Sequence, residues 1–139
     1  MESALRFYGD RVGLEVLDDA VVDEPEMSEF LGLGDHEALR AVMLSASGGP
    51  PYLELFQFLG AKDASPRERQ TPLGIGSSHP CFLVSDIQQE YQRLSAAGVQ
   101  FTRPPMEIDG GPFEGQWILY GFDPDGSIVE FWSIPGVSG

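Results

Sequence analysis

The sequence has few of the residues that would link the protein to an oxidising compartment, a polyanion or a membrane. Cys81 is the single cysteine among 139 residues, so no internal disulfide can form, and we expect a reducing, cytoplasmic location. Only 8 Lys and Arg oppose 22 Asp and Glu, and the net charge of −14 repels phosphate backbones and anionic lipids. No apolar run approaches the ~20 residues that cross a bilayer. We therefore expect neither a nucleic-acid nor a membrane partner.

Several common catalytic motifs are also missing. The chain contains no phosphate-binding loop, no Cys-x-x-Cys pair and no nucleophile motif. Histidine is scarce: His36 lies in a turn-like segment, and His79 lies near the start of an apolar run. Cys81 has no basic residue near it in sequence that would lower its pKa, so we expect an inert core residue.

What the sequence does contain is a repeated apolar segment that carries one carboxylate. Glu54 lies in Leu-Glu-Leu-Phe at 53–56, Glu130 lies in Val-Glu-Phe-Trp at 129–132, and a turn rich in Gly or Pro precedes each copy. Burying an unpaired carboxylate costs roughly several kcal/mol, so each glutamate should be buried with a partner. A metal ion that both glutamates bind would be such a partner.

Apolar periodicity predicts two helices, at residues 3–12 and 86–97, each followed by a glycine and then a strand. Their apolar stripes are Leu5, Tyr8 and Val12 in the first helix and Ile87, Tyr91 and Leu94 in the second. Because each helix has one apolar face, each should pack on one face of a sheet.

Two longer connections are predicted between the strands. The acidic segment 18–34 is predicted to be a loop with one helical turn that starts at Pro25. The Gly/Pro-rich segment 104–115 is predicted to be a loop, and either a plain connector or a lid over a site would fit it.

The strand pattern predicts an α+β fold class. Strands are expected at residues 14–17, 39–44, 52–59, 77–84, 99–102, 116–122 and 128–134. Residues 1–59 then form an αβββ module, 60–76 a polar linker and 77–139 a βαβββ module, within one compact domain. The first-module strand that would match 77–84 would precede Met1, so we expect this module to lack its opening strand.

Glu54, His79 and Glu130 are the candidate metal ligands. The alternation of side chains along a strand places both glutamates beside aromatic residues on one strand face. One imidazole and two carboxylates suit Zn²⁺, Ni²⁺, Co²⁺, Mn²⁺ or Fe²⁺. Taken singly, a strand histidine is more often a hydrogen-bonded core residue, and a glutamate in an apolar strand more often faces solvent. The matched repeat favours the metal site for the three together.

A set of short segments carries a family resemblance in its order and spacing. The segments are residues 4–8, 12–16, 53–55, 82–84, 96–99, 123–126 and 128–130, together with His79 and Asp86. They resemble the glyoxalase/bleomycin-resistance/extradiol-dioxygenase (vicinal oxygen chelate) superfamily over nearly the whole chain. The resemblance implies two βαβββ modules that form an incomplete barrel around a metal. It assigns Glu54, His79 and Glu130 to three ligand positions and the fourth ligand to the missing strand.

The resemblance also implies an activity. A carboxylate at position 54 is similar to glyoxalase I and its lyase or isomerase relatives, because ring-cleaving dioxygenases of the superfamily typically use two histidines and one glutamate. The implied enzyme acts on a small-molecule substrate by removing a proton next to a metal-chelated carbonyl. Glu130 is the implied base, and Glu54 is a ligand or second base. A homodimer is expected, because dimer contacts usually complete the cups of this family.

Two other functions stay open at this point. One is a metal-free, bleomycin-resistance-like protein that binds a cationic antibiotic, which the net charge of −14 favours. The other is an extradiol dioxygenase. Metal content separates the binding protein from the enzymes, and Fe²⁺-dependent oxygen uptake with a catechol separates the dioxygenase from the lyase.

Overall fold

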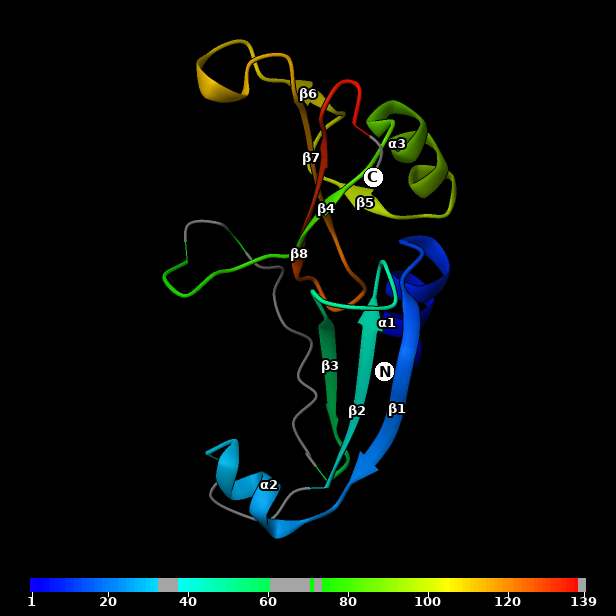
Figure 1. The fold of residues 1–139 in the computed structure, drawn as a ribbon, viewed down its shortest axis with the longest axis vertical. Helices are drawn as coiled ribbons and strands as arrows, with labels where there is room; N and C mark the ends of the chain where they lie inside the picture. The colour runs from blue at the N-terminus through cyan, green and yellow to red at the C-terminus, as the bar shows by residue number, and fades with distance from the viewer. Residues whose placement is uncertain (33–37, 61–70, 72–73, 138–139) are drawn as a thin grey trace. The chain divides into compact units, whose positions relative to one another are not determined.

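The computed structural model describes residues 1–32, 38–60, 71 and 74–137. The chain divides into two compact units, residues 1–65 and 66–139 (Figure 1). Each unit contains one sheet with helices, and neither sheet closes into a barrel within the described residues, so the predicted α+β class is confirmed. His36 and most of the predicted linker, residues 60–76, lie outside the described residues.

The first unit opens with a helical segment of two geometries, the α-helix α1 (Glu2–Leu5) followed by the π-helix η1 (Arg6–Arg11). The wider turn is visible where the Val12 N–H donates to the Phe7 carbonyl at 2.9 Å, five residues back. Phe7 is only 1% exposed and Tyr8 is buried, whereas Leu5 and Val12 stay partly exposed. The predicted stripe was therefore wrong at Leu5 and Val12, because a 3.6-residue period does not apply to a π-helix.

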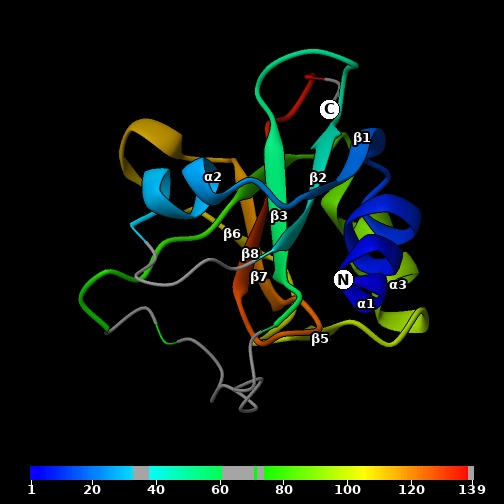
Figure 2. The same cartoon turned by 90° about the horizontal axis from the view of Figure 1, so that it is seen from below.

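The sheet of the first unit is antiparallel, in the order β1 (Glu15–Val22), β2 (Leu39–Ser45) and β3 (Leu53–Phe58). β2 is the central strand, and its Val42 and Leu44 are completely buried. Figure 2 shows α1 beside these strands. β1 is longer than predicted and runs into the acidic segment, where a bulge between Val16 and Asp18 keeps it paired with β2. The turn predicted at Pro25 forms the helix α2 (Pro25–Phe30).

The second unit has a sheet in the order β4-β8-β7-β5, and β6 pairs with β7. The strands are β4 (Cys81–Leu83), β5 (Gln100–Phe101), β6 (Met106–Glu107), β7 (Trp117–Phe122) and β8 (Ile128–Ser133). β4 runs parallel to β8, and the other pairs are antiparallel. β8 is thus a central strand with a partner on each side.

Helix α3 (Ile87–Ala96) follows the sequence prediction closely. The Asp86 carboxylate caps it by accepting hydrogen bonds from two backbone N–H groups of its first turn, and Gly98 follows with φ +83. Ile87 and Leu94 are buried, and the Tyr91 ring meets an aromatic ring of β5 edge to face. At ten residues this helix is too short to cross a bilayer, and no helix in the described part of the chain qualifies as a membrane span.

In the second unit, two predicted segments also differ from the structure. The strand expected at 77–84 is reduced to β4, because Pro80 has no N–H to donate and only its carbonyl takes part, accepting from the Glu130 N–H at 2.9 Å. The loop expected at 104–115 contains β6 and the 3₁₀ turn η2 (Gly111–Phe113). Residues 104–115 therefore contain the first strand, β6, and the turn of a hairpin whose second strand is β7.

Candidate metal and substrate site

Strand β8 positions Glu130 at the centre of the second sheet. Val129 and Phe131 are completely buried, and Phe131 packs on Phe101, which in turn contacts Tyr91 of α3. Because successive side chains of a strand point to opposite faces, Glu130 points to the face opposite α3. It is nevertheless only 6% exposed. The predicted burial of this carboxylate is confirmed.

The structure brings His79 and Glu130 together. His79 lies in the extended segment just before β4, and its Nε2 is 3.1 Å from Glu130 Oε2. The His79 side chain is 33% exposed, and its ring meets the Tyr120 ring edge to face at 5.5 Å between centroids. Tyr120 lies directly across from Glu130 in the β7–β8 pair. Three polar side chains from separate segments therefore gather on one face of the sheet.

The second oxygen of the carboxylate, Glu130 Oε1, is buried and has no hydrogen-bond partner. Burial and, after it, the Glu130 carboxylate raise the pKa of its neighbours Tyr120 and Cys81 to about 12, so both stay uncharged well above neutral pH. Leaving such an acceptor unsatisfied costs about 1–3 kcal/mol. An ion or a proton donor that met this oxygen would remove that cost.

Cys81 itself differs from its prediction. Its side chain is exposed and does not belong to the core, although enough water is excluded around the sulfur to raise the pKa of the thiol to about 12. The residue remains a protonated thiol rather than a reactive thiolate. Its role beside Glu130 is therefore to flank the carboxylate without adding charge.

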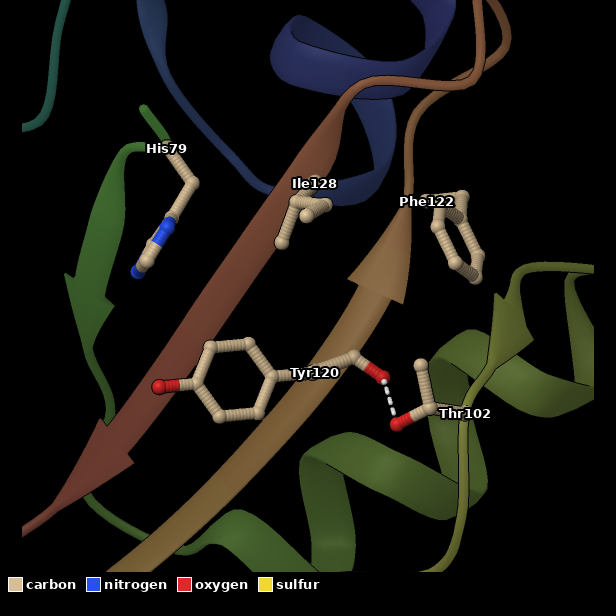
Figure 3. Close-up of a pocket in the computed structure, with 5 residues that line it drawn as sticks. All are labelled: His79, Thr102, Tyr120, Phe122 and Ile128. Carbon is tan, nitrogen blue, oxygen red and sulfur yellow. Dashed lines mark hydrogen bonds between the residues drawn. The ribbon is translucent and has the colours of Figure 1, made fainter. Parts of the chain in front are cut away.

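A cavity of about 350 Å³ opens on the same face (Figure 3). Its lining residues are His79, Thr102, Tyr120, Phe122 and Ile128. In the β7–β8 hairpin Tyr120 faces Glu130 and Phe122 faces Ile128, so the cavity wall and the carboxylate share one sheet face. The Thr102 hydroxyl donates to the Tyr120 carbonyl at 3.2 Å and fixes the far side of the cavity. His79 is the residue that joins the cavity to the carboxylate.

The geometry of the His79–Glu130 pair fits a divalent ion. Two ligands that are each about 2.1 Å from one ion, at tetrahedral or octahedral angles, lie roughly 3.0–3.4 Å apart. The observed 3.1 Å falls in that range, and it also serves as a hydrogen bond when the two groups meet directly. No group of three or more His, Cys, Asp or Glu side chains within the described residues is placed to hold a metal. The pair thus supplies one nitrogen and two carboxylate oxygens, one of them unpartnered.

Glu54 lies on β3 of the first unit, opposite Met43 of β2. It is exposed, so the predicted burial of both glutamates was wrong for Glu54. Its neighbours Leu53 and Leu55 alternate with it and are half-buried, as the strand period requires. Its role as a metal ligand stays a prediction.

Sequence reasoning missed the cavity residues Thr102, Tyr120, Phe122 and Ile128. A signal was available, because the tight turn at 123–126 fixes the register of the two strands that flank it. That register places Tyr120 opposite Glu130, and every second residue from there lies on the same face. The contribution of Thr102 depends on the pairing of β5 with β7, which the sequence alone does not specify.

Comparisons with known proteins agree with this architecture. Residues 1–131 match the family model described as Glyoxalase/Bleomycin resistance protein/Dioxygenase superfamily. The structure of a glyoxalase family protein from Bacillus cereus is similar with a TM-score of 0.83 and 19% identity, covering 98% of this chain and 87% of that one. No curated protein sequence matches the chain.

Two further solved structures are similar at comparable identity. A superfamily member from Sphaerobacter thermophilus has a TM-score of 0.61 and 22% identity, over 96% of this chain and 87% of that one. The trypanothione-dependent glyoxalase I of Leishmania major has a TM-score of 0.60 and 20% identity, over 96% and 78% of the two chains. At these identities the likeness shows the fold alone. The family match over most of the chain shows more: this protein belongs to the Glyoxalase/Bleomycin resistance protein/Dioxygenase superfamily.

Proposed function

We propose that this protein is a metal-dependent lyase or isomerase, similar to glyoxalase I, that removes a proton from a carbon next to a carbonyl group. One observation carries the proposal: Glu130 is buried, one of its oxygens is oriented by His79, and the other has no partner. A carboxylate oxygen with a free lone pair beside an apolar cavity suits a general base, because water does not compete for it.

In this proposal His79 and Glu130 hold a divalent ion, and Glu54 is the predicted third ligand. Such an ion, Zn²⁺, Ni²⁺, Co²⁺, Mn²⁺ or Fe²⁺, would place positive charge beside two neighbouring substrate oxygens and make the adjacent C–H more acidic. Residues of the protein bind the ion, accept the proton and limit the access of water. His79 Nε2 and Glu130 Oε2 would bind the ion, Glu130 Oε1 takes the proton, and the cavity wall formed by Phe122 and Ile128 limits the access of water. The proposed enzyme is a cytoplasmic homodimer that acts on a small molecule.

The net charge of −14 supports a second candidate, a metal-free protein that binds a cationic antibiotic. The cavity argues against it, because none of the five described residues that line it is Asp or Glu. The described part of the cavity wall therefore contains none of the acidic residues that give the chain its charge. We rank this function below the enzyme for that reason.

The experiment that tests the proposal follows exchange of the substrate C–H with solvent deuterium by NMR. Protein stripped of metal with a chelator and then reloaded with each of the five candidate ions is mixed with α-ketoaldehyde thiol adducts and acyl thioesters. We expect exchange with at least one ion that disappears after chelation. Tight binding of a cationic glycopeptide together with no exchange under any loading would favour the binding protein instead.

A further inference from the structure

The cavity beside Glu130 is small, and the part of its wall that the structure describes is largely apolar. Its volume of about 350 Å³ is near the lower end of the ~300–1,000 Å³ that ligand pockets span, so it suits a small chemical group. None of the five lining residues that the structure describes is Lys or Arg. The polar groups of these residues are the His79 imidazole, which meets Glu130, the Tyr120 hydroxyl, and the Thr102 hydroxyl, which donates to a backbone carbonyl.

The remaining wall is apolar and largely aromatic. The rings of Tyr120 and Phe122, together with the Ile128 side chain, project into this space from two paired strands (Figure 3). Aromatic rings prefer edge-to-face or offset contacts with another ring, and the His79–Tyr120 pair already shows such a contact. A flat, uncharged ring entering the cavity would find partners of the same kind.

An anionic group would be disfavoured in the same place. It would lose water without gaining a cationic partner from the five wall residues described, and such desolvation of a charge is costly. The excess of acidic over basic residues in the chain as a whole acts in the same direction.

We infer that this cavity binds the uncharged, aryl-sized acyl end of the substrate, and that it rejects substrates with an acidic group at that end. The inference deepens the proposed function and rests on it, because it identifies the substrate class of the same site. The carbonyl and the neighbouring oxygen lie toward His79 and Glu130, and the ring lies between Tyr120, Phe122 and Ile128. Thr102 lies at the exposed side of the cavity, so a charged side chain introduced there should change which ligand charge the cavity accepts.

Three matched probes test this inference by calorimetric titration of the metal-loaded full chain. They are 2-hydroxyacetophenone, hydroxyacetone, which replaces the ring by a methyl group, and 4-(hydroxyacetyl)benzoic acid, which adds a carboxylate at the far end of the ring. All three present the same ketone and hydroxyl oxygens. We expect 2-hydroxyacetophenone to bind at least about tenfold more tightly than either of the others, since burial of apolar area favours the ring and desolvation penalises the carboxylate.

Variants at Thr102 provide a gain of function. Thr102→Lys places a cation at the cavity, and Thr102→Gln is the neutral control of similar length. We expect Thr102→Lys to bind the carboxylate probe at least about fivefold more tightly than Thr102→Gln does, since the two variants differ in charge and share the loss of the hydroxyl. Both substitutions are at an exposed position, so the fold should persist.

The result that overturns the inference is equal or tighter binding of the carboxylate probe or of hydroxyacetone by the wild-type protein, or no binding of 2-hydroxyacetophenone. Deuterium exchange at the hydroxymethyl carbon, followed in the same samples, separates this failure from a failure of the proposed reaction. Exchange with hydroxyacetone or the carboxylate probe but not with the neutral aryl probe contradicts only the specificity. The expected order of binding without exchange in any probe contradicts the reaction and supports the assignment of the cavity.

Discussion

His79 Nε2 lies 3.1 Å from Glu130 Oε2, although the two residues come from different segments and are 51 positions apart. This contact orients the carboxylate and leaves its other oxygen, Oε1, buried without a partner. The same separation fits two ligands of one ion, which links the geometry of the pair to the proposed metal site.

The first prediction concerns His79 as a ligand. His79→Ala should lower the affinity for the activating divalent ion by at least about 100-fold, because it removes the nitrogen donor and leaves Glu130 without its orienting contact. Metal titration by calorimetry measures this, and the urea midpoint shows whether the fold persists. Unchanged metal affinity in a folded His79→Ala variant would remove His79 from the site.

The second prediction concerns Glu54. Because Glu54 is exposed on β3, Glu54→Gln should change the free energy of unfolding by less than about 0.5 kcal/mol. As the predicted third ligand, it should nevertheless weaken metal binding about 10–100-fold. Glu15→Gln, at an exposed position on β1 of the same unit, is the matched control. If both variants bind the ion as tightly as the wild type, Glu54 is not a ligand.

The third prediction tests the packing of β7 on β5. A Cβ atom at Gly121 would lie 2.9 Å from Phe101 Cδ1 and 3.2 Å from the Gln100 carbonyl oxygen, and the backbone oxygen cannot move aside. Gly121→Ala should therefore destabilise the second unit by about 1–3 kcal/mol. Urea unfolding followed by tryptophan fluorescence reports on this unit, because both tryptophans of the chain, Trp117 and Trp132, lie in it.

Gly110→Ala is the control for that measurement. A Cβ atom at Gly110 meets nothing within 4 Å, and the residue has an extended backbone that alanine adopts without strain. We expect its unfolding midpoint to match the wild type. A Gly121→Ala variant as stable as this control would show that β5 can move away from β7.

The fourth prediction is a dependence of stability on alkaline pH. The folded state raises the pKa of both Tyr120 and Cys81 to about 12, from ordinary values of 10.0 and 9.0, so it favours their neutral forms. This stabilisation is complete below pH 9 and is lost as the pH rises toward 12. The urea midpoint should therefore fall over this interval, and Tyr120→Phe and Cys81→Ala should each make the fall smaller. Tyr52→Phe, at an exposed position, should not.

Local sequence signals predicted much of the fold. The Asp86 cap, the apolar stripe of α3 and the turn between β7 and β8 are encoded within a few residues, and the structure confirms them. The stripe of the first helix failed because the choice of a π-helix depends on how Phe7 and Tyr8 pack, not on local propensity. The late start of β4, at Cys81, depends on Pro80, whose missing N–H was visible in the sequence, although the extent of strand pairing was not.

The candidate site was predictable in part. The placement of Glu130 in an apolar strand indicated a buried carboxylate that needs a partner, and the structure places His79 against it. The cavity was not predicted, because its wall combines residues from β7, β8 and the segment after β5, and that combination follows from strand pairing over long sequence distances. The repeated sequence pattern does not by itself predict burial, because Glu130 is buried in one strand and Glu54 is exposed in the other.

Deuterium exchange by Glu130→Gln at saturating metal tests the central claim most directly. Glutamine keeps the shape of the side chain but cannot accept the proton, so we expect exchange to fall at least ~100-fold while metal affinity falls no more than ~10–100-fold. Glu107→Gln, at an exposed position on β6, should exchange like the wild type. A metal-saturated Glu130→Gln protein that exchanges the substrate proton at the wild-type rate would contradict the assignment of Glu130 as the base.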